Sequence, residues 1–164
     1  MRNYLFNTEK IKYVLSEKSG SHCIFCSIRD GEEDVKNLNL FQTDLSLITL
    51  NLYPLNPGHL MILPLRHITC YEELSDAEAA DIFKCTRLSI RILNSEFQPH
   101  GYNIGYNLGE GSGASIGHIH QHIVPRYRNE AGFLEVLGGT KISLVDPVDA
   151  FERIAGKFKE AAER

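Results

Sequence analysis

The sequence predicts an α+β fold, with an antiparallel sheet of about five strands and helices packed on it. Four short stretches have the length and residue types of strands, at 45–50, 60–63, 102–108 and 118–124. Two longer stretches, which begin at Ser75 and Asp146, carry helix-start signals. The order strand, strand, helix, strand, strand, helix indicates an antiparallel sheet with the helices on one side.

The first two strands are separated by a turn. Residues 45–50 read Leu-Ser-Leu-Ile-Thr-Leu, and the second apolar stretch covers 60–63. Between them, residues 54–58 read Pro-Leu-Asn-Pro-Gly, and prolines and glycine in this arrangement are typical of a turn. We therefore expect the two strands to pair like a hairpin.

Both helices show a cap and an apolar stripe. Ser75 and Glu78 have the spacing of a capping box, and Asp146 precedes Pro147, a residue favoured at the first helical position. The stripe of the first helix comprises Ala79, Ile82, Phe83, Thr86, Ile90 and Leu93. The stripe of the second comprises Phe151, Ile154 and Phe158.

Length and composition are typical of one globular domain. We expect this domain in residues 21–164, preceded by an N-terminal arm in residues 1–20. No apolar run approaches the ~20 residues that span a bilayer, and residues 1–13 lack the apolar core of a signal peptide. We therefore expect a cytoplasmic protein without a membrane partner. The formal net charge of −4, with acids and bases interspersed, argues against a duplex nucleic acid partner but allows a small phosphorylated substrate.

The strongest functional signal is the alternation of His118, His120 and His122. In a strand these side chains share one face, roughly 6–7 Å apart. Three imidazoles so close would repel one another if all were charged, so at least one is expected to be neutral near pH 7. A single histidine here would be explained by a polar strand that faces solvent. Three histidines in strict alternation favour a functional role instead. A neutral imidazole can serve as a nucleophile or a metal ligand.

The loop just before these histidines, 109–117, consists almost entirely of small residues. Its glycines let backbone N–H groups approach an anion closely. Alone, such a loop is also compatible with a plain hairpin connection. Directly before the histidines, it predicts a phosphate held against an imidazole ring.

The pair Cys23 and Cys26 has the spacing of half a tetrahedral zinc site. A redox pair or two buried thiols would show the same spacing, although a redox pair lacks its usual βαβ context here. The candidates for the missing ligands are His22, His67, His100 and His118. Cys70 and Cys85 stand alone in the sequence, and we expect both to be small core residues.

Three segments together resemble the histidine triad superfamily, in the branch of diadenosine tetraphosphate phosphorylases and related hydrolases. They are 50–59 (LNLYPLNPGH), 101–109 (GYNIGYNLG) and 118–126 (HIHQHIVPR). Gln121 departs from the apolar spacer usual in the superfamily, but a histidine–glutamine–histidine step is found in this branch. The resemblance covers about residues 10–158 and implies a HIT-like fold.

The resemblance also implies roles for individual residues. His120 matches the nucleophile, His122 a histidine that contacts phosphate oxygens, and His59 a histidine behind the nucleophile that helps to orient it. The implied nucleotide-binding residues are Asn51 for the ribose hydroxyls and Asn107, Gly113 and Ser115 for the phosphate and the scissile bridge. The implied structural zinc site comprises Cys23, Cys26, His67 and His118.

The implied activity is cleavage of dinucleoside polyphosphates, such as diadenosine tetraphosphate, at the α-phosphate through a nucleotidyl-histidine intermediate. The enzyme would be a hydrolase or a phosphorylase, with a small nucleotide as substrate, and a homodimer. One alternative is a purine nucleoside phosphoramidase, with which Ser115 is compatible. Another is a non-catalytic, nucleotide-binding regulatory module.

Overall fold

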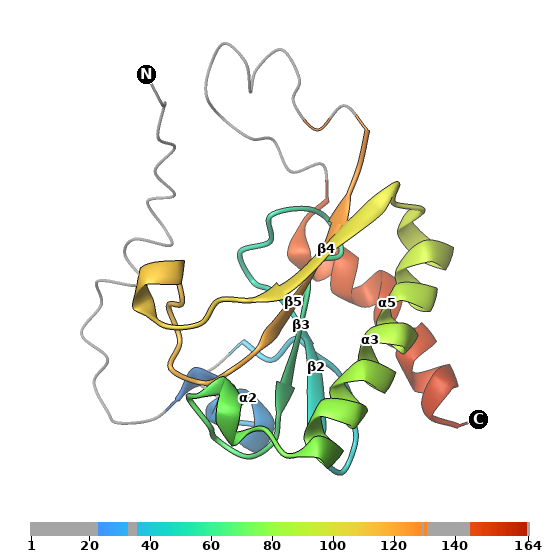
Figure 1. Cartoon of the computed structure of the whole chain (residues 1–164). Helices are drawn as coiled ribbons and strands as arrows, with labels where there is room; N and C mark the ends of the chain where they lie inside the picture. The colour runs from blue at the N-terminus through green and yellow to red at the C-terminus, as the bar shows by residue number, and fades with distance from the viewer. Residues whose placement is uncertain (1–22, 33–35, 129, 131–144, 164) are drawn as a thin grey trace, which may run out of the picture.

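The computed structural model describes residues 23–32, 36–128, 130 and 145–163, so the predicted arm in residues 1–20 lies outside the described residues (Figure 1). The α+β prediction is confirmed: five antiparallel strands form one sheet in the order β1-β2-β3-β5-β4. The strands are β1 (Asn39–Gln42), β2 (Ser46–Leu50), β3 (Leu60–Pro64), β4 (Gly101–Tyr106) and β5 (Gln121–Arg126). The helices are α2 (Ile24–Asp30), α3 (Asp76–Phe97) and α5 (Pro147–Ala162), with short 3-10 turns η1 (Tyr71–Glu73) and η2 (Glu110–Ser112).

The sheet is covered on both faces, whereas the sequence predicted helices on one side only. Figure 1 shows α3 and α5 together on one side of the sheet and α2 away from them. Ile48 and Ile62 belong to the core under α3 and α5, while Leu47 and Met61 pack with Phe25 of α2. Because both faces are covered, β2 and β3 are buried along their whole length, and most of their residues are apolar rather than alternating with polar ones.

The hairpin-like pairing of β2 and β3 is confirmed, and β3 also pairs with β5. In this register Thr49 is opposite Met61, and Met61 is opposite His122. These three residues therefore form one row across the face of the sheet that α2 covers. The row leads from the first hairpin to the histidine segment.

Helix α3 begins as predicted, and its buried face agrees only in part with the predicted stripe: Ile82, Thr86 and Leu93 are buried. The capping box of Ser75 and Glu78 is complete. Phe83, placed in the predicted stripe, is 62% exposed, and Ala79 is also exposed. The buried face comprises Glu78, Ile82, Cys85, Thr86, Ser89, Ile92 and Leu93. A hydrophobic pattern could not reveal all of this face, because several of its members are small or polar.

Helix α5 agrees with the sequence: the Asp146 side chain caps it, and Ile154 and Phe158 are fully buried. Of the two isolated cysteines, Cys85 lies in the core as predicted, but the prediction for Cys70 is wrong, because Cys70 is exposed just before η1. Among the described residues, no helix is long and apolar enough to cross a bilayer.

Candidate active site and metal cluster

The histidine segment enters the sheet later than predicted. Strand β5 begins at Gln121, and the backbone N–H of Ile119 donates to the Ile68 carbonyl, beyond the end of β3. The rings nevertheless gather on the α2 side. The ring centroids of His120 and His122 lie 4.7 Å apart, and Phe25 contacts the rings of both His118 and His120. The side chain of Gln121 instead accepts a hydrogen bond from Thr86 of α3.

Four residues far apart in the sequence form a cluster that could hold a metal ion: Cys23, Cys26, His67 and His118. Their ligand atoms all lie within 4.8 Å of one another. Nδ1 of His118 lies 3.5 Å from Sγ of Cys23. Nδ1 of His67 lies 3.5 Å from Sγ of Cys26. Ligands on a tetrahedral zinc with the usual bond lengths have sulfur–nitrogen separations of about 3.5 Å, so the spacing fits that ion.

The environment of the cluster also suits a cation. The Nε2 atom of His118 lies 3.0 Å from the Pro64 carbonyl oxygen, which only accepts, so Nε2 carries the proton and Nδ1 offers its lone pair to the cysteines. Burial, above all, lowers the pKa of His118 to about 4 and keeps the ring neutral. Burial first, and then Cys23, raises the pKa of Cys26 to about 11. A bound cation would counteract this rise in pKa by stabilising the thiolate form of the cysteines.

Beside this cluster lies a pocket of about 270 Å³. The predicted residues His120, His122, Asn51, Asn107, Gly113 and Ser115 all line it. Its apolar lining, which the sequence did not predict, includes Ile24, Phe25 and Ile28 from α2 and Met61 from the sheet. The spacing of Ile24, Phe25 and Ile28 before Gly31, which caps α2, was a helix signal that the cysteine pattern obscured.

The ring of His120 is fixed in one tautomer. Its Nδ1 lies 2.8 Å from the backbone carbonyl oxygen of His118, which only accepts, so Nδ1 carries the proton. The lone pair is then on Nε2, and His120 lines the pocket. Burial lowers the pKa of His120 below its ordinary value. Burial, rather than the repulsion between imidazoles expected from the sequence, is therefore the main reason why this ring is neutral.

The ring of His59, which is 2% exposed, lies against His122. Its Nε2 is 3.0 Å from Nδ1 of His122, whereas the resemblance implied a place behind His120. The backbone N–H of Leu55 donates to Nδ1 of His59, so neutral His59 carries its proton on Nε2 and donates it to His122. His122 in turn carries its proton on Nε2. The two pocket histidines therefore have opposite tautomers.

The pocket lining combines polar and apolar side chains. The row Thr49–Met61–His122 spans two strand spacings, about 10 Å. The lining includes polar residues, Asn51, Asn107 and Ser115, as well as apolar side chains of α2 and Met61 of β3. Gly113 has φ 88°, a conformation that favours glycine. Such a pocket suits a ligand that has both apolar and polar or charged parts.

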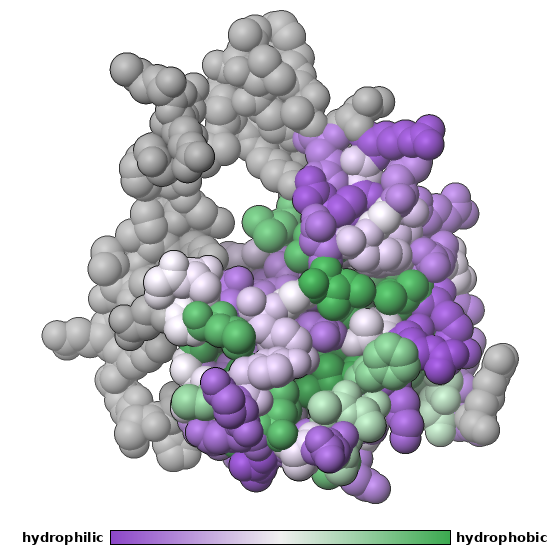
Figure 2. Space-filling view, in the orientation of Figure 1, coloured by the Kyte–Doolittle hydropathy of each residue, from purple (hydrophilic) through white to green (hydrophobic). Residues whose placement is uncertain are grey.

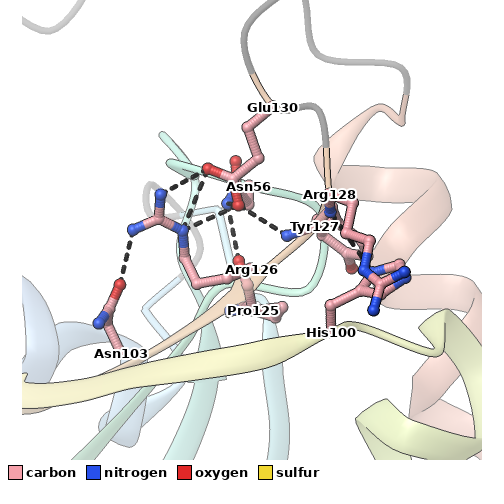
Figure 3. A network of polar contacts seen from close by, with 8 residues as sticks. All are labelled: Asn56, His100, Asn103, Pro125, Arg126, Tyr127, Arg128 and Glu130. Atoms are coloured by element: carbon pink, nitrogen blue, oxygen red, sulfur yellow. Dashed lines mark hydrogen bonds and ion pairs between the residues drawn. The ribbon is translucent and has the colours of Figure 1, made fainter.

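Of the two remaining candidate ligands, the structure describes only His100, which is not in the cluster. His100 is exposed, and its Nδ1 accepts a hydrogen bond from the backbone of Arg128 (Figure 3). His22 lies outside the described residues.

Residues 32–129 match the HIT domain, and the chain therefore belongs to the HIT family. Its HIT-like fold agrees with a solved structure, a Zn-bound histidine triad family protein from Mycobacterium smegmatis. That structure has a TM-score of 0.69 and 20% identity, and the match covers 86% of this chain and 96% of the other. At this identity the likeness concerns the fold.

Two curated relatives are more similar in sequence. An AP-4-A phosphorylase of Mycobacterium tuberculosis is 41% identical over 110 residues, which are 66% of this chain and 56% of that protein. An adenosine 5'-monophosphoramidase of Schizosaccharomyces pombe is 34% identical over 110 residues, 67% of this chain and 78% of that protein. The match thus spans little more than half the length of the phosphorylase.

Proposed function

We propose that this chain cleaves dinucleoside polyphosphates at the α-phosphorus through a nucleotidyl intermediate on His120. The observation that carries the proposal is the hydrogen bond from His120 Nδ1 to the His118 carbonyl, which leaves the Nε2 lone pair of a buried, neutral ring at the pocket. A fixed, neutral imidazole is a competent nucleophile near pH 7. The similarity to an AP-4-A phosphorylase supports the substrate class.

The reaction has two steps. Nε2 of His120 attacks the α-phosphorus; a nitrogen–phosphorus bond forms, and the phosphorus–oxygen bond to the rest of the polyphosphate breaks, so that this group leaves with the electron pair. Water or inorganic phosphate then attacks, the nitrogen–phosphorus bond breaks, and its electrons return to Nε2. The Nε2–H of His122 and the backbone around Gly113 donate to the phosphoryl oxygens as negative charge develops.

The acceptor distinguishes a hydrolase from a phosphorylase, and product analysis measures it directly. With diadenosine tetraphosphate and no phosphate, a hydrolase releases AMP and ATP. With inorganic phosphate as acceptor, a phosphorylase releases ADP in place of AMP. Failure to cleave this substrate or other dinucleoside polyphosphates in either buffer would overturn the proposal.

A second candidate activity is hydrolysis of nucleoside phosphoramidates, favoured by the similarity to the monophosphoramidase and by Ser115 in the pocket. An amine must be protonated to leave, whereas a polyphosphate departs without much help. We therefore expect Ser115→Ala to slow phosphoramidate cleavage by about tenfold and to affect polyphosphate cleavage little. Comparing kcat/KM for both substrates, in the parent and the variant, decides between the two activities.

We further propose that the cysteine–histidine cluster holds a structural zinc ion. Four protein ligands, two cysteines and two histidines, would fill its coordination sphere and leave no position for substrate, as in other structural sites. Metal analysis of protein purified without chelator should give about one zinc per chain. Protein that is free of metal and equally stable would contradict this assignment.

The implied homodimer remains a proposal. Strand β4 is an edge of the sheet, and Ile104 on β4 and Phe83 on α3 are 44% and 62% exposed. Figure 2 shows apolar surface across the middle of this face, where β4 and α3 lie in Figure 1. Pairing of two β4 edges would cover it. Light scattering should give twice the chain mass for the parent and the single mass for Ile104→Asp; a monomeric parent would contradict the proposal.

A further inference from the structure

The loop between β2 and β3 is held against the far end of β5 by a polar network (Figure 3). We call its members Asn56, Pro125, Tyr127 and Glu130 the loop clamp. The Asn56 side-chain amide donates to the Pro125 carbonyl at 2.7 Å and to Oε1 of Glu130 at 3.1 Å. The Tyr127 hydroxyl donates to the Pro57 carbonyl at 3.0 Å. Asn56 is 4% exposed, so its amide has exchanged water for these partners.

Glu130 organises the clamp from the strand side. Its Oε1 accepts from the backbone N–H of Tyr127 at 2.6 Å and from the Arg126 guanidinium at 2.8 Å, besides Asn56. Arg126 is held from its other side by the Asn103 side chain. The carboxylate therefore fixes the chain as it leaves β5 and presents an acceptor to the loop.

The same loop makes two hydrogen bonds to His59. The Asn56 carbonyl accepts from the backbone N–H of His59 at 3.1 Å, and the preceding residue, Leu55, donates its N–H to Nδ1 of the His59 ring. Asn56 thus contacts β5 through its side chain and His59 through its backbone. His59 in turn contacts His122, which lies on β5 three residues before Pro125. The hydrogen bonds and the two chain segments form a closed ring.

The loop is tightly packed at its Gly58 end, whereas Leu55 is 61% exposed. Gly58 has φ 79°, and a Cβ there would be 2.9 Å from a methyl carbon of Leu93 and 3.4 Å from the Pro125 ring. The backbone at this point therefore lies directly against α3 and β5. A loop released from the clamp would move the Leu55 N–H, which donates to Nδ1 of His59 and thereby favours the proton on Nε2 of that ring.

We propose that Asn56 and Glu130 are positioning residues that keep the His59–His122 pair in the tautomer with a proton on each Nε2. This proposal deepens the proposed function. Only its effect on catalysis rests on that function, whereas the position of the protons does not. If Leu55 moves away, the proton of His59 can sit on Nδ1, and His122 then donates from Nδ1 and turns a bare Nε2 to the phosphate. That nitrogen would repel a phosphoryl oxygen instead of donating to it.

The test combines ring tautomers with kinetics in Asn56→Ala, Glu130→Ala and Glu130→Gln. Long-range ¹H–¹⁵N spectra of the imidazoles, recorded at alkaline pH where imidazoles are neutral, distinguish protonated from unprotonated ring nitrogens. In the parent we expect Nε2–H on both His59 and His122. Both alanine variants should add Nδ1–H signals for both rings, and Glu130→Gln, which keeps an acceptor oxygen, should restore most of the parent spectrum.

For cleavage of diadenosine tetraphosphate, the alanine variants should lower kcat by about tenfold or more and change KM less than about threefold, since the lost donor acts on the transition state. Asn103→Ala is the matched control: it removes a contact of the same network on the side away from the loop, and it should leave spectra and kcat unchanged. Folding of each variant is checked by circular dichroism.

The two arms of the experiment separate the two proposals. Folded alanine variants with parent tautomers would overturn the positioning role, as would altered tautomers with parent kcat. Altered tautomers in a protein whose parent cleaves no nucleotide would support the positioning role and reject the proposed function.

Discussion

His118 and His120 are buried imidazoles two residues apart that face different surroundings. His118 donates from Nε2 to a carbonyl and turns Nδ1 to two cysteines, in a cluster with four ligands. His120 donates from Nδ1 to the His118 carbonyl and offers Nε2 at a pocket. Burial lowers the pKa of both rings. The comparison teaches that the backbone acceptor selects the free nitrogen, which meets cysteine thiols in His118 and a pocket in His120; the proposed roles of metal ligand and nucleophile follow from this difference.

The largest expected effect is on the pocket side. We expect His120→Asn to lower kcat by about 10³-fold or more, because no covalent intermediate can form, while nucleotide binding is retained. Steady-state kinetics and calorimetry measure the two quantities. The control is His100→Asn, an exposed imidazole outside the pocket, which should behave as the parent. Turnover by His120→Asn at the rate of the parent would contradict the assignment of His120 as the nucleophile. Nucleotide binding without turnover in both the parent and the variant would contradict it as well.

The next effect is on the metal side. Cys26→Ser should lose the bound zinc and several kcal/mol of unfolding free energy, since metal binding adds to folding. Nucleotide affinity should also fall, because the helix that begins beside Cys23 carries Phe25 into the pocket. Metal analysis, thermal unfolding and calorimetry test this, with Cys70→Ser as the control on an exposed thiol. Unchanged stability in Cys26→Ser would contradict a structural role.

The smallest effect concerns the turn that carries His67. Arg66 bonds both carboxylate oxygens of Glu78, and Glu78 completes the capping box of α3. Glu78→Ala should cost about 1 kcal/mol of unfolding free energy, and Glu78→Gln less, because glutamine can still complete the box. Chemical denaturation measures both. If Glu78→Gln also lowered kcat, the turn that carries His67 and the pocket would not be independent of each other.

The same carboxylate gives a pH dependence with a definite sign. Hydrogen bonding to Arg66, and then to Ser75, lowers the pKa of Glu78 from 4.5 to about 2. Since the folded value lies below the unfolded one, this contribution to stability is present above pH 4.5 and is lost as the pH falls towards 2. Unfolding free energies between pH 2 and 5 should therefore fall less steeply in Glu78→Gln than in the parent. Equal slopes would show that the pair contributes nothing.

The sequence predicted the elements that local chemistry defines. The capping box at Ser75, the cap at Asp146 and the turn between the first two strands depend on neighbouring residues, and all three are present. The alternating histidines and the paired cysteines identified the two centres for the same reason. The four residues of the metal cluster were named from the family resemblance, and the structure brings them together.

What the sequence did not reveal depends on contacts between distant segments. Helix α2 was not predicted, so the apolar lining that it gives the pocket was missed. The buried face of α3 includes Glu78 and Ser89, which no apolar pattern would select. The contact of His59 with His122 depends on the pairing of β3 with β5 and on the loop before β3. Register and loop position come from the tertiary structure.

The most direct test of the account is to trap the covalent intermediate. Protein mixed with excess diadenosine tetraphosphate and quenched within one turnover is digested, and the peptide that contains His120 is weighed. The account predicts a mass increase of one adenylyl group on that peptide, located on His120 by fragmentation and absent from His120→Asn. Rapid cleavage with no adduct at any quench time, or an adduct on another residue, would contradict it.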